Sequence, residues 1–195
     1  EAGLGGGSAD GAGVLVGLNS LLGSPLRTER LMELGARIGA DIPFCIQGGT
    51  AMVRGYGEIL EPLEPLKNCR MLISKPLVGI STAECFARYD ALGKPYGIPG
   101  NPVIKKAVNA GDLSAVCQLL YNALEEVVEL PEVQEIRETM LKAGASGSCM
   151  TGSGSAVFGI FPRSEQQESA ARALKRKGYF PCRCSPVNYG ATITE

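Results

Sequence analysis

Histidine is absent from this sequence of 195 residues. Its absence excludes serine and cysteine hydrolases with a histidine base, other enzymes with a histidine general base, and most zinc enzymes. The G-x-S-x-G pattern of a nucleophile elbow is missing as well. Any chemistry in this chain must therefore use acidic, basic, hydroxyl or thiol side chains, or backbone groups.

An excess of either charge is also lacking. Lys and Arg number 19 against 20 Asp and Glu, which gives a formal net charge of −1. Nucleic-acid-binding domains normally carry a basic excess, so we expect no nucleic-acid partner. No apolar run approaches the roughly 18 residues of a membrane helix, so we expect no membrane partner and a cytosolic location.

Cysteine pairs with metal-site spacing are missing, although the chain has seven cysteines. Cys182 and Cys184, in a C-x-C arrangement, come closest. Side chains two apart on a strand share a face and could meet a metal, but the chain offers no second pair and no histidine. We therefore expect buried, reduced thiols.

The composition is that of a globular protein, with 45% hydrophobic and 20% charged residues. The length allows one domain or two small ones, and Pro62, Pro65 and Lys67 mark the best boundary between two. Helices and strands alternate without a repeating βαβ rhythm, which indicates an α+β fold.

Periodicity, caps and turn residues predict the individual elements. We expect helices at 8–22, 28–38, 102–110, 112–129, 131–143 and 164–177, and one that opens with a capping box at Ser81–Glu84. We expect strands at 44–46, 50–54, 70–74, 156–161 and 180–187, a turn and edge strand at 55–64, and loops at 89–101 and 144–155.

A glycine-rich stretch leads into the first predicted helix. Each glycine inside that helix costs up to about 1 kcal/mol relative to alanine, which is tolerated where something must approach the backbone. Free N–H groups at a helix N-terminus form an anion site, and phosphate is the usual ligand. The P-loop does not fit because no lysine precedes Lys67, and a G-x-G-x-x-G pattern from Gly3 ends on Ser8. The alternative is a glycine turn that only lets two backbones pack.

Asp41 stands between a predicted helix end and Pro43. The proline biases Ile42 towards an extended conformation, which would fix the chain direction just after the aspartate. An aspartate at such a junction is either a cap or turn former, or a carboxylate aimed at a substrate hydroxyl.

The loop Thr151-Gly-Ser-Gly-Ser155 precedes a predicted strand. It is either a flexible connection or a second backbone cradle for an anion.

Taken together and in this order, these stretches resemble the GHMP kinases, a family of ATP-dependent small-molecule kinases. The family's glycine-serine phosphate loop corresponds to Gly3-Leu4-Gly5-Gly6-Gly7-Ser8. Further stretches that match are Gly39–Pro43, Gly55–Leu60, Lys75-Pro76, Ile80–Glu84, Asn122–Glu125 and Thr151–Phe158. The resemblance runs over nearly the whole chain.

The resemblance implies an α+β fold of two domains. Residues 1–66 would be the C-terminal part of a ribosomal-protein-S5-like, ATP-binding N-terminal domain, and residues 67–195 a ferredoxin-like C-terminal domain. It also implies ATP and Mg²⁺ as cofactors. It identifies no Mg²⁺ ligand, because glycines stand where the family often has serines.

The resemblance further implies a role for each site residue. It assigns Asp41 to catalysis, as the group that takes the proton from the substrate hydroxyl or orients it. It assigns the ATP triphosphate to Gly3, Leu4, Gly5, Gly6, Gly7, Ser8 and Ala9, and a second phosphate loop to Gly152, Ser153, Gly154 and Ser155.

The likeness is strongest to the branch of the family that phosphorylates the 2-hydroxyl of a cytidine-diphosphate-linked methylerythritol, in the non-mevalonate route to isoprenoid precursors. The family carries a catalytic lysine upstream of the phosphate loop, so we expect this chain to be a fragment that is inactive alone. The alternatives are a family kinase acting on mevalonate, homoserine or a sugar, a non-catalytic nucleotide-binding module, or a structural α+β domain. No pattern indicates the oligomeric state.

Overall fold

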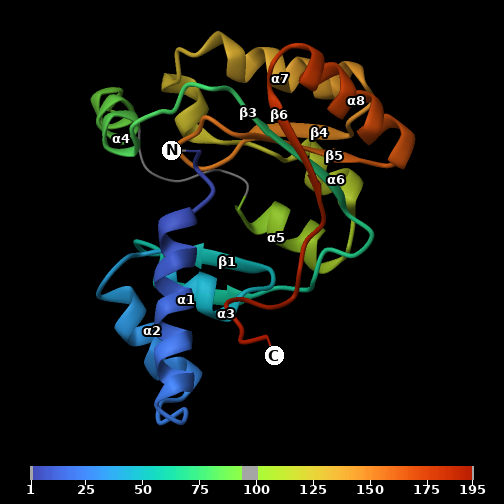
Figure 1. Ribbon diagram of the computed structural model, residues 1–195. Coiled ribbons are helices and arrows are strands. Elements are labelled where there is room, and N and C mark those ends of the chain that lie inside the picture. Colours follow the sequence, from blue (N-terminus) through green and yellow to red (C-terminus); the bar gives the residue numbers. More distant parts are fainter. Residues whose placement is uncertain (1, 94–100, 195) are drawn as a thin grey trace. The chain divides into compact units, whose positions relative to one another are not determined.

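The computed structural model describes residues 2–93 and 101–194, and it divides the chain into two compact units (Figure 1). We call residues 1–4 with 66–185 the sheet unit, and residues 5–65 with 186–195 the helical unit. The chain leaves the helical unit after Pro65, among the residues that mark the predicted boundary. The family's division into 1–66 and 67–195 stays a prediction, since the compact units assign both ends of the chain differently.

The helical unit packs three helices around a small core. Its elements are α1 (Gly6–Leu21), α2 (Thr28–Ala36) and α3 (Ile42–Gln47), followed by the antiparallel pair β1 (Ala51–Arg54) and β2 (Ile59–Pro62). The buried core residues are Ala12, Leu31, Ile42 and Ile46. The helices predicted at 8–22 and 28–38, the strand at 50–54 and the edge strand within 55–64 are confirmed, and the ends of the two helices lie within two residues of those predicted.

Ile42 links all three helices of this unit. A Cβ atom built on Gly11 of α1 would lie 2.9 Å from Ile42 Cδ1, and one on Gly35 of α2 would lie 2.6 Å from Ile42 Cγ2. Glycine at these two positions leaves the room that the isoleucine side chain occupies. The group that approaches the α1 backbone at Gly11 is thus a protein side chain.

The strand predicted at 44–46 is wrong, because these residues lie inside α3. Pro43 lies in the first turn of α3, where the N–H groups have no intrahelical acceptor, so the missing N–H of proline loses no hydrogen bond of the helix. Ile42 and Ile46 are four residues apart, so both point to the same face and are buried there. The segment is too short to show a hydrophobic periodicity, so burial of this face determines that it is a helix.

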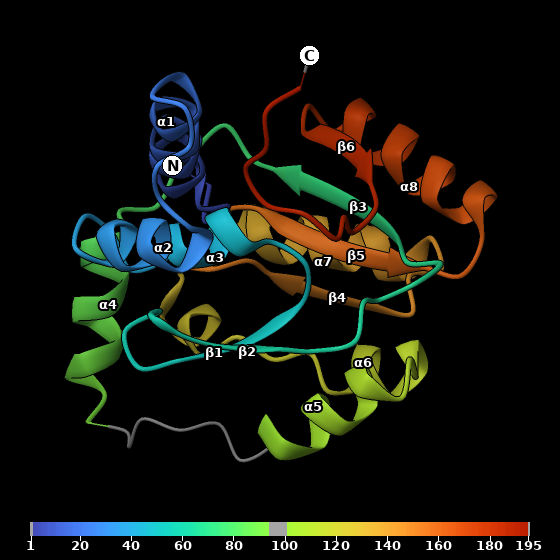
Figure 2. The same ribbon diagram turned by 90° about the horizontal axis from the view of Figure 1, so that it is seen from below.

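The sheet unit contains a four-stranded antiparallel sheet with the order β4-β5-β3-β6 (Figures 1 and 2). Its strands are β3 (Arg70–Lys75), β4 (Gly147–Met150), β5 (Val157–Phe161) and β6 (Phe180–Cys184). Its helices are α4 (Thr82–Ala91), α5 (Asn101–Asn109), α6 (Leu113–Gln118), the 3-10 helix η1 (Ala123–Val127), α7 (Pro131–Lys142) and α8 (Ser164–Arg176). The expected α+β class is confirmed.

Helices α7 and α8 cover one face of this sheet, as Figure 1 shows. The main core lies between them and the strands, and its buried members are Leu72, Val133, Ile136, Met140, Met150, Val157, Phe161, Ala170 and Leu174. Strand β3 alternates as a half-buried strand should, with Leu72 and Ser74 fully buried and their neighbours less so. A smaller cluster on Cys69, Cys117 and Ile160 brings α6 against the sheet.

Three predictions for the sheet unit need correction. The helix predicted at 112–129 is two shorter helices, because Asn122 lies in extended backbone (φ −132°, ψ 111°) and caps the separate helix η1. The loop predicted at 144–155 contains β4, whose small residues are buried and paired with β5. The loop predicted at 89–101 begins inside α4, and residues 94–100 lie outside the described residues. Burial against neighbouring elements overrides weak local propensity at β4.

The cysteines are all reduced, as expected. Cys69, Cys85, Cys117 and Cys149 are buried, Cys45 and Cys184 are half-buried, and Cys182 is exposed, so the expectation of burial is wrong for Cys182. Burial, reinforced by the neighbouring Glu125 carboxylate, raises the pKa of Cys149 to about 12. A thiol held protonated in this way is a packing group rather than a nucleophile.

Replacing Ile136 with alanine removes a fully buried side chain from the face of α7 that meets the sheet. We expect Ile136→Ala to lower the free energy of unfolding by about 2–5 kcal/mol, because the cavity cannot close completely. Leu141→Ala on the same helix is the control, since Leu141 is 41% exposed. Denaturant unfolding of both variants measures the difference, and equal losses would contradict the assignment of the core.

Candidate functional site

The glycine-rich segment ends where α1 begins. Gly5 is the N-cap of this 16-residue helix and adopts a left-handed backbone (φ 65°). The first hydrogen bond of the helix runs from Ala9 N–H to the Gly5 carbonyl, at 2.9 Å. Within the described residues, the N–H groups of Gly6, Gly7 and Ser8 therefore have no acceptor. These groups and the positive end of the helix dipole favour an anion.

The space around these glycines is open. A Cβ atom built on Gly5, Gly6 or Gly7 would meet no heavy atom within 4 Å. Close packing against the described residues therefore does not explain the lack of side chains at these positions. The observation fits the anion-site interpretation for Gly6 and Gly7, whereas the left-handed backbone of Gly5 favours glycine by itself.

Gly3 is different, because it packs tightly within the sheet unit. Its backbone is left-handed (φ 66°), and a Cβ atom there would lie 2.2 Å from the Thr151 carbonyl oxygen. The Thr151 hydroxyl donates to the Gly3 carbonyl at 2.9 Å, and Ala156 N–H donates to the Ala2 carbonyl at 3.2 Å. The alternative of a glycine that lets two backbones pack thus holds at Gly3.

Asp41 occupies the N-cap position of α3 but does not cap it with its side chain. Its backbone carbonyl accepts a hydrogen bond from Cys45 N–H at 3.1 Å, while the exposed carboxylate has no hydrogen-bond or ion-pair partner within the described residues. Burial, and then the Asp41 charge, raise the pKa of the Cys45 thiol. The side chain is therefore free for an external ligand, while the next residue, Ile42, fixes its backbone.

The loop Thr151–Ser155 is held firmly, which argues against a flexible connection. Ser153, Gly154 and Ser155 are buried. The Ser153 hydroxyl lies 2.8 Å from the Thr82 hydroxyl, and the Ser155 hydroxyl donates to the Val78 carbonyl at 2.6 Å. The N–H groups of Gly152 and Ser153 have no acceptor in the described part of the chain, so they remain available to an anion.

Sequence reasoning missed the contribution of two side chains to this loop. Thr82 and Asn122 stand in stretches that carry the family resemblance, but their types and positions alone indicated no partner. Asn122 donates to the carbonyls of Met150 and Gly152 at 2.9 and 2.8 Å. An asparagine that directly precedes a short helix is a recognisable cap, but its second partner lies 30 residues away and leaves no local signal.

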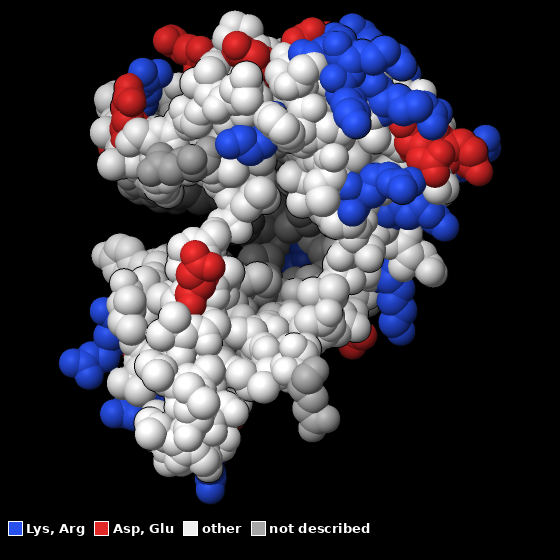
Figure 3. Space-filling model, viewed as in Figure 1, with Lys and Arg blue, Asp and Glu red and all other residues white. Residues whose placement is uncertain are grey.

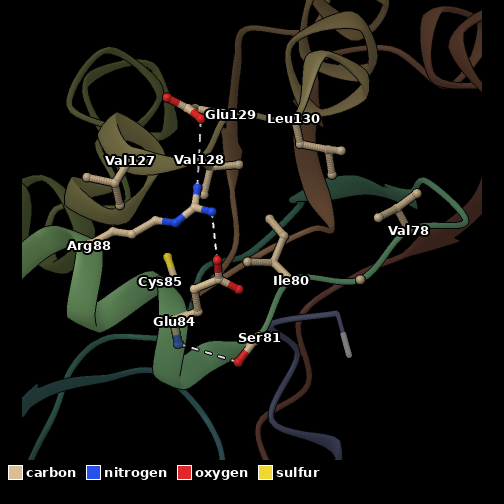
Figure 4. A pocket seen from close by; sticks show the side chains of 11 residues that line it. Val78, Ile80, Ser81, Glu84, Cys85, Arg88, Val127, Val128, Glu129 and Leu130 are labelled. Carbon is tan, nitrogen blue, oxygen red and sulfur yellow. Dashed lines mark hydrogen bonds and ion pairs between the residues drawn. The ribbon is translucent and has the colours of Figure 1, made fainter.

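A separate pocket of about 170 Å³ lies between α4 and the segment after η1 (Figure 4). Val78, Ile80, Val127, Val128 and Leu130 form its apolar wall. Its charged groups are already paired, because Arg88 binds Glu84 at 2.7 Å and Glu129 at 3.9 Å. None of the predicted site residues lines this pocket, and we assign it no role in the site.

Side chains of the described residues form no metal site by themselves. The described residues contain no group of three His, Cys, Asp or Glu side chains that could hold an ion. They also contain no helix long and apolar enough to cross a membrane.

Basic side chains gather over one part of the sheet unit (Figure 3), where α8 ends in Lys175 and Arg176.

Two family models match the chain. The GHMP kinases N terminal domain matches residues 1–49, and the GHMP kinases C terminal domain matches residues 104–179. These ranges include the open glycines, Asp41 and the Thr151–Ser155 loop.

Curated relatives carry one activity in their names. The 4-diphosphocytidyl-2-C-methyl-D-erythritol kinase of Alkaliphilus metalliredigens (strain QYMF) is 44% identical over 175 residues, which is 89% of this chain and 60% of the relative. That of Synechococcus sp. (strain JA-2-3B'a(2-13)) is 46% identical over 188 residues, which is 90% of this chain and 60% of the relative. The chain thus spans about 60% of the length of these relatives.

Solved structures agree with the sequence comparison. A crystal structure of 4-(cytidine 5'-diphospho)-2C-methyl-D-erythritol kinase superposes with a TM-score of 0.74 and 32% identity, covering 93% of this chain and 66% of that one. Homoserine kinase from Cytophaga hutchinsonii has a TM-score of 0.68 but 19% identity, covering 89% of this chain and 62% of that one, and therefore shares the fold alone. With both of its domain models matched in order and its relatives so named, this chain belongs to the GHMP kinase family.

Proposed function

We propose that this chain belongs to an ATP-dependent kinase that phosphorylates the 2-hydroxyl of 4-diphosphocytidyl-2-C-methyl-D-erythritol. The observation that carries the proposal is the open N-terminus of α1, where Gly6, Gly7 and Ser8 offer unpaired N–H groups. The choice of substrate rests on relatives of that activity, which are 44–46% identical over about nine-tenths of the chain.

In this proposal the α1 N-terminus binds the triphosphate of ATP. The phosphate oxygens accept from the free N–H groups of Gly6, Gly7 and Ser8, and the helix dipole adds a favourable field. Phosphoryl transfer depends mainly on positioning and charge stabilisation, which backbone donors supply without histidine. We also propose that Leu4, Gly5 and Ala9 line the triphosphate site at the start of α1. Gly3, which is packed against Thr151, would hold the first residues of this segment in place.

Asp41 is the proposed general base. The substrate hydroxyl oxygen bonds to the γ-phosphorus as the bond to the ADP oxygen breaks, and the hydroxyl proton passes to the Asp41 carboxylate. The absence of any partner for this carboxylate in the described residues supports the role, because a paired carboxylate would have to break an existing contact first.

We propose that Gly152, Ser153, Gly154 and Ser155 provide a second set of phosphate contacts. The unpaired N–H groups of Gly152 and Ser153 support this role, and the hydroxyl bonds that hold the loop would preorganise them.

Mg²⁺ would enter with the nucleotide. The ion prefers octahedral oxygen ligands and commonly takes most of them from substrate phosphates and water, with one or two protein oxygens. When bound, the ion neutralises phosphate charge; none of the residue roles above depends on a particular protein ligand to it.

Replacing Asp41 with asparagine removes the proposed base with almost no change in shape. In a protein of the relatives' full length that contains this sequence, we expect Asp41→Asn to lower kcat by about 100-fold or more and to leave ATP affinity within about twofold. Asp112→Asn is the control, because Asp112 caps α6 and an asparagine keeps that cap. Steady-state kinetics and calorimetry measure both quantities, and an unchanged kcat would leave a non-catalytic nucleotide-binding module as the better interpretation.

A negative charge at the start of α1 should separate nucleotide binding from stability. Gly7→Glu fits the open space and places an acidic side chain in the first turn, where the helix dipole favours it, so thermal stability should not fall. The same charge repels phosphate, so ATP affinity should fall at least about tenfold. Gly13→Glu, also in open space but beyond the first turn, should leave affinity unchanged. Equal affinities for both variants would place the phosphates elsewhere.

A further inference from the structure

Strand β4 lies at the edge of the sheet, and only one of its sides pairs with another strand. Thr151 N–H, directly after β4, donates to the Ala156 carbonyl at 2.9 Å and so marks the side that faces β5. Backbone groups alternate in direction along a strand, so those of Ser148 and Met150 point outward. An outward row of this kind needs partners from elsewhere.

Side chains from η1, from its N-cap residue and from α7 bind three backbone groups of this outer row. Arg137 Nε donates to the Ser148 carbonyl at 3.1 Å, and the Glu125 carboxylate accepts from Met150 N–H at 3.3 Å. Asn122 Nδ2 donates to the Met150 carbonyl at 2.9 Å. Arg137 and Glu125 also form an ion pair at 3.0 Å. We call Asn122, Glu125 and Arg137 the edge clamp.

Asn122 extends the clamp beyond the strand into the Thr151–Ser155 loop. Its Nδ2 also donates to the Gly152 carbonyl at 2.8 Å, while its Oδ1 accepts from Leu124 N–H at 3.0 Å. Because the Asn122 Oδ1 accepts from Leu124 N–H, the Asn122 Nδ2 must be the atom that faces the Met150 and Gly152 carbonyls. One side chain thus fastens the end of β4 and the first turn of the loop to η1.

The loop in turn holds Gly3. The Thr151 hydroxyl, next to the carbonyl that Asn122 binds, donates to the Gly3 carbonyl at 2.9 Å. A Cβ atom at Gly3 would lie 2.7 Å from Gly154 N, so the glycine has almost no room to shift against the loop. Gly3 precedes Gly5, the N-cap of α1, by two residues.

We propose that Asn122 is a positioning residue for nucleotide binding, which acts through the Thr151–Ser155 loop and Gly3 on the start of the phosphate segment. This inference rests on the proposed function for its effect on ATP, but not for its effect on Gly3. Asn122 touches neither the reacting atoms nor the phosphates in this account. It fixes the backbone that must hold them.

The test must separate this role from that of a helix cap. Asn122→Asp keeps the oxygen that accepts from Leu124 N–H, but it replaces both donor contacts with a charged oxygen against two carbonyl oxygens. Asp112→Ala is the matched control, since it removes a side-chain cap at 2.9 Å from another helix of the sheet unit and touches no part of the loop.

Three measurements on a protein of the relatives' full length that contains this sequence decide the matter. They are amide hydrogen exchange, the Kd for ATP by calorimetry, and the melting temperature. For Asn122→Asp we expect amide exchange to be about tenfold faster at Gly154, whose N–H donates to the Thr151 carbonyl, and at Ala156, whose N–H donates to the Ala2 carbonyl beside Gly3. We also expect the Kd to rise about tenfold, as the loss of one or two hydrogen bonds predicts. Asp112→Ala should lower the melting temperature and change neither other quantity.

A double variant tests the route. Thr151→Val removes the hydroxyl contact to Gly3, so adding it to Asn122→Asp should weaken ATP binding less than the sum of the two single effects. Unchanged exchange at Ala156 in Asn122→Asp, or additive effects in the double variant, would overturn the proposal. If the unsubstituted protein does not bind ATP, the proposed function fails, and the exchange data at Ala156 still decide the positioning role.

Discussion

The start of α1 imposes the main constraint on this molecule, because its first N–H groups have no acceptor among the described residues. A helix end of this kind is stable only when water or a ligand satisfies it, so it has to stay open while the rest of the helix is held in place. In the helical unit, Ile42 supplies the hold by packing against Gly11, one turn beyond the open glycines. Gly6 and Gly7 in the first turn thus leave the backbone open to solvent or a ligand, whereas Gly11 lets a protein side chain pack against the helix.

The candidate base is built on the same principle of a fixed backbone and a free side chain. Asp41 precedes Ile42, which is buried and packs against Gly11 and Gly35, yet the Asp41 carboxylate has no partner in the described residues. The fixed backbone limits the positions that the carboxylate can reach. Because the carboxylate is unpaired in the described residues, it need not break an existing contact to bind a substrate. A base that must accept a proton at a defined place benefits from both properties.

The sequence predicts those parts of the fold in which local chemistry and burial agree. Half of the capping box predicted at Ser81–Glu84 is present: the Ser81 hydroxyl accepts from Glu84 N–H at 3.4 Å, while the Glu84 carboxylate pairs with Arg88. The predictions are wrong where contacts with distant residues determine the secondary structure. Residues 44–46 lie in helix α3 because Ile42 and Ile46 are buried together. Residues 147–150 form strand β4 because β5 and the edge clamp bind its backbone. The sequence predicts an anion site in the glycine segment, but it does not predict that Gly3 is a packing residue, because the partner of Gly3, Thr151, is 148 positions away.

The edge clamp has a consequence for the solubility of the sheet. An unpaired outer edge on β4 would be a template for a strand from another molecule, and the clamp occupies that edge with side chains that cannot continue a ladder. At the opposite edge, β6 carries Pro181, which has no N–H to donate to a further strand. Intermolecular strand addition is therefore blocked by different means at the two ends of one sheet, and loss of the clamp would expose a β-aggregation site.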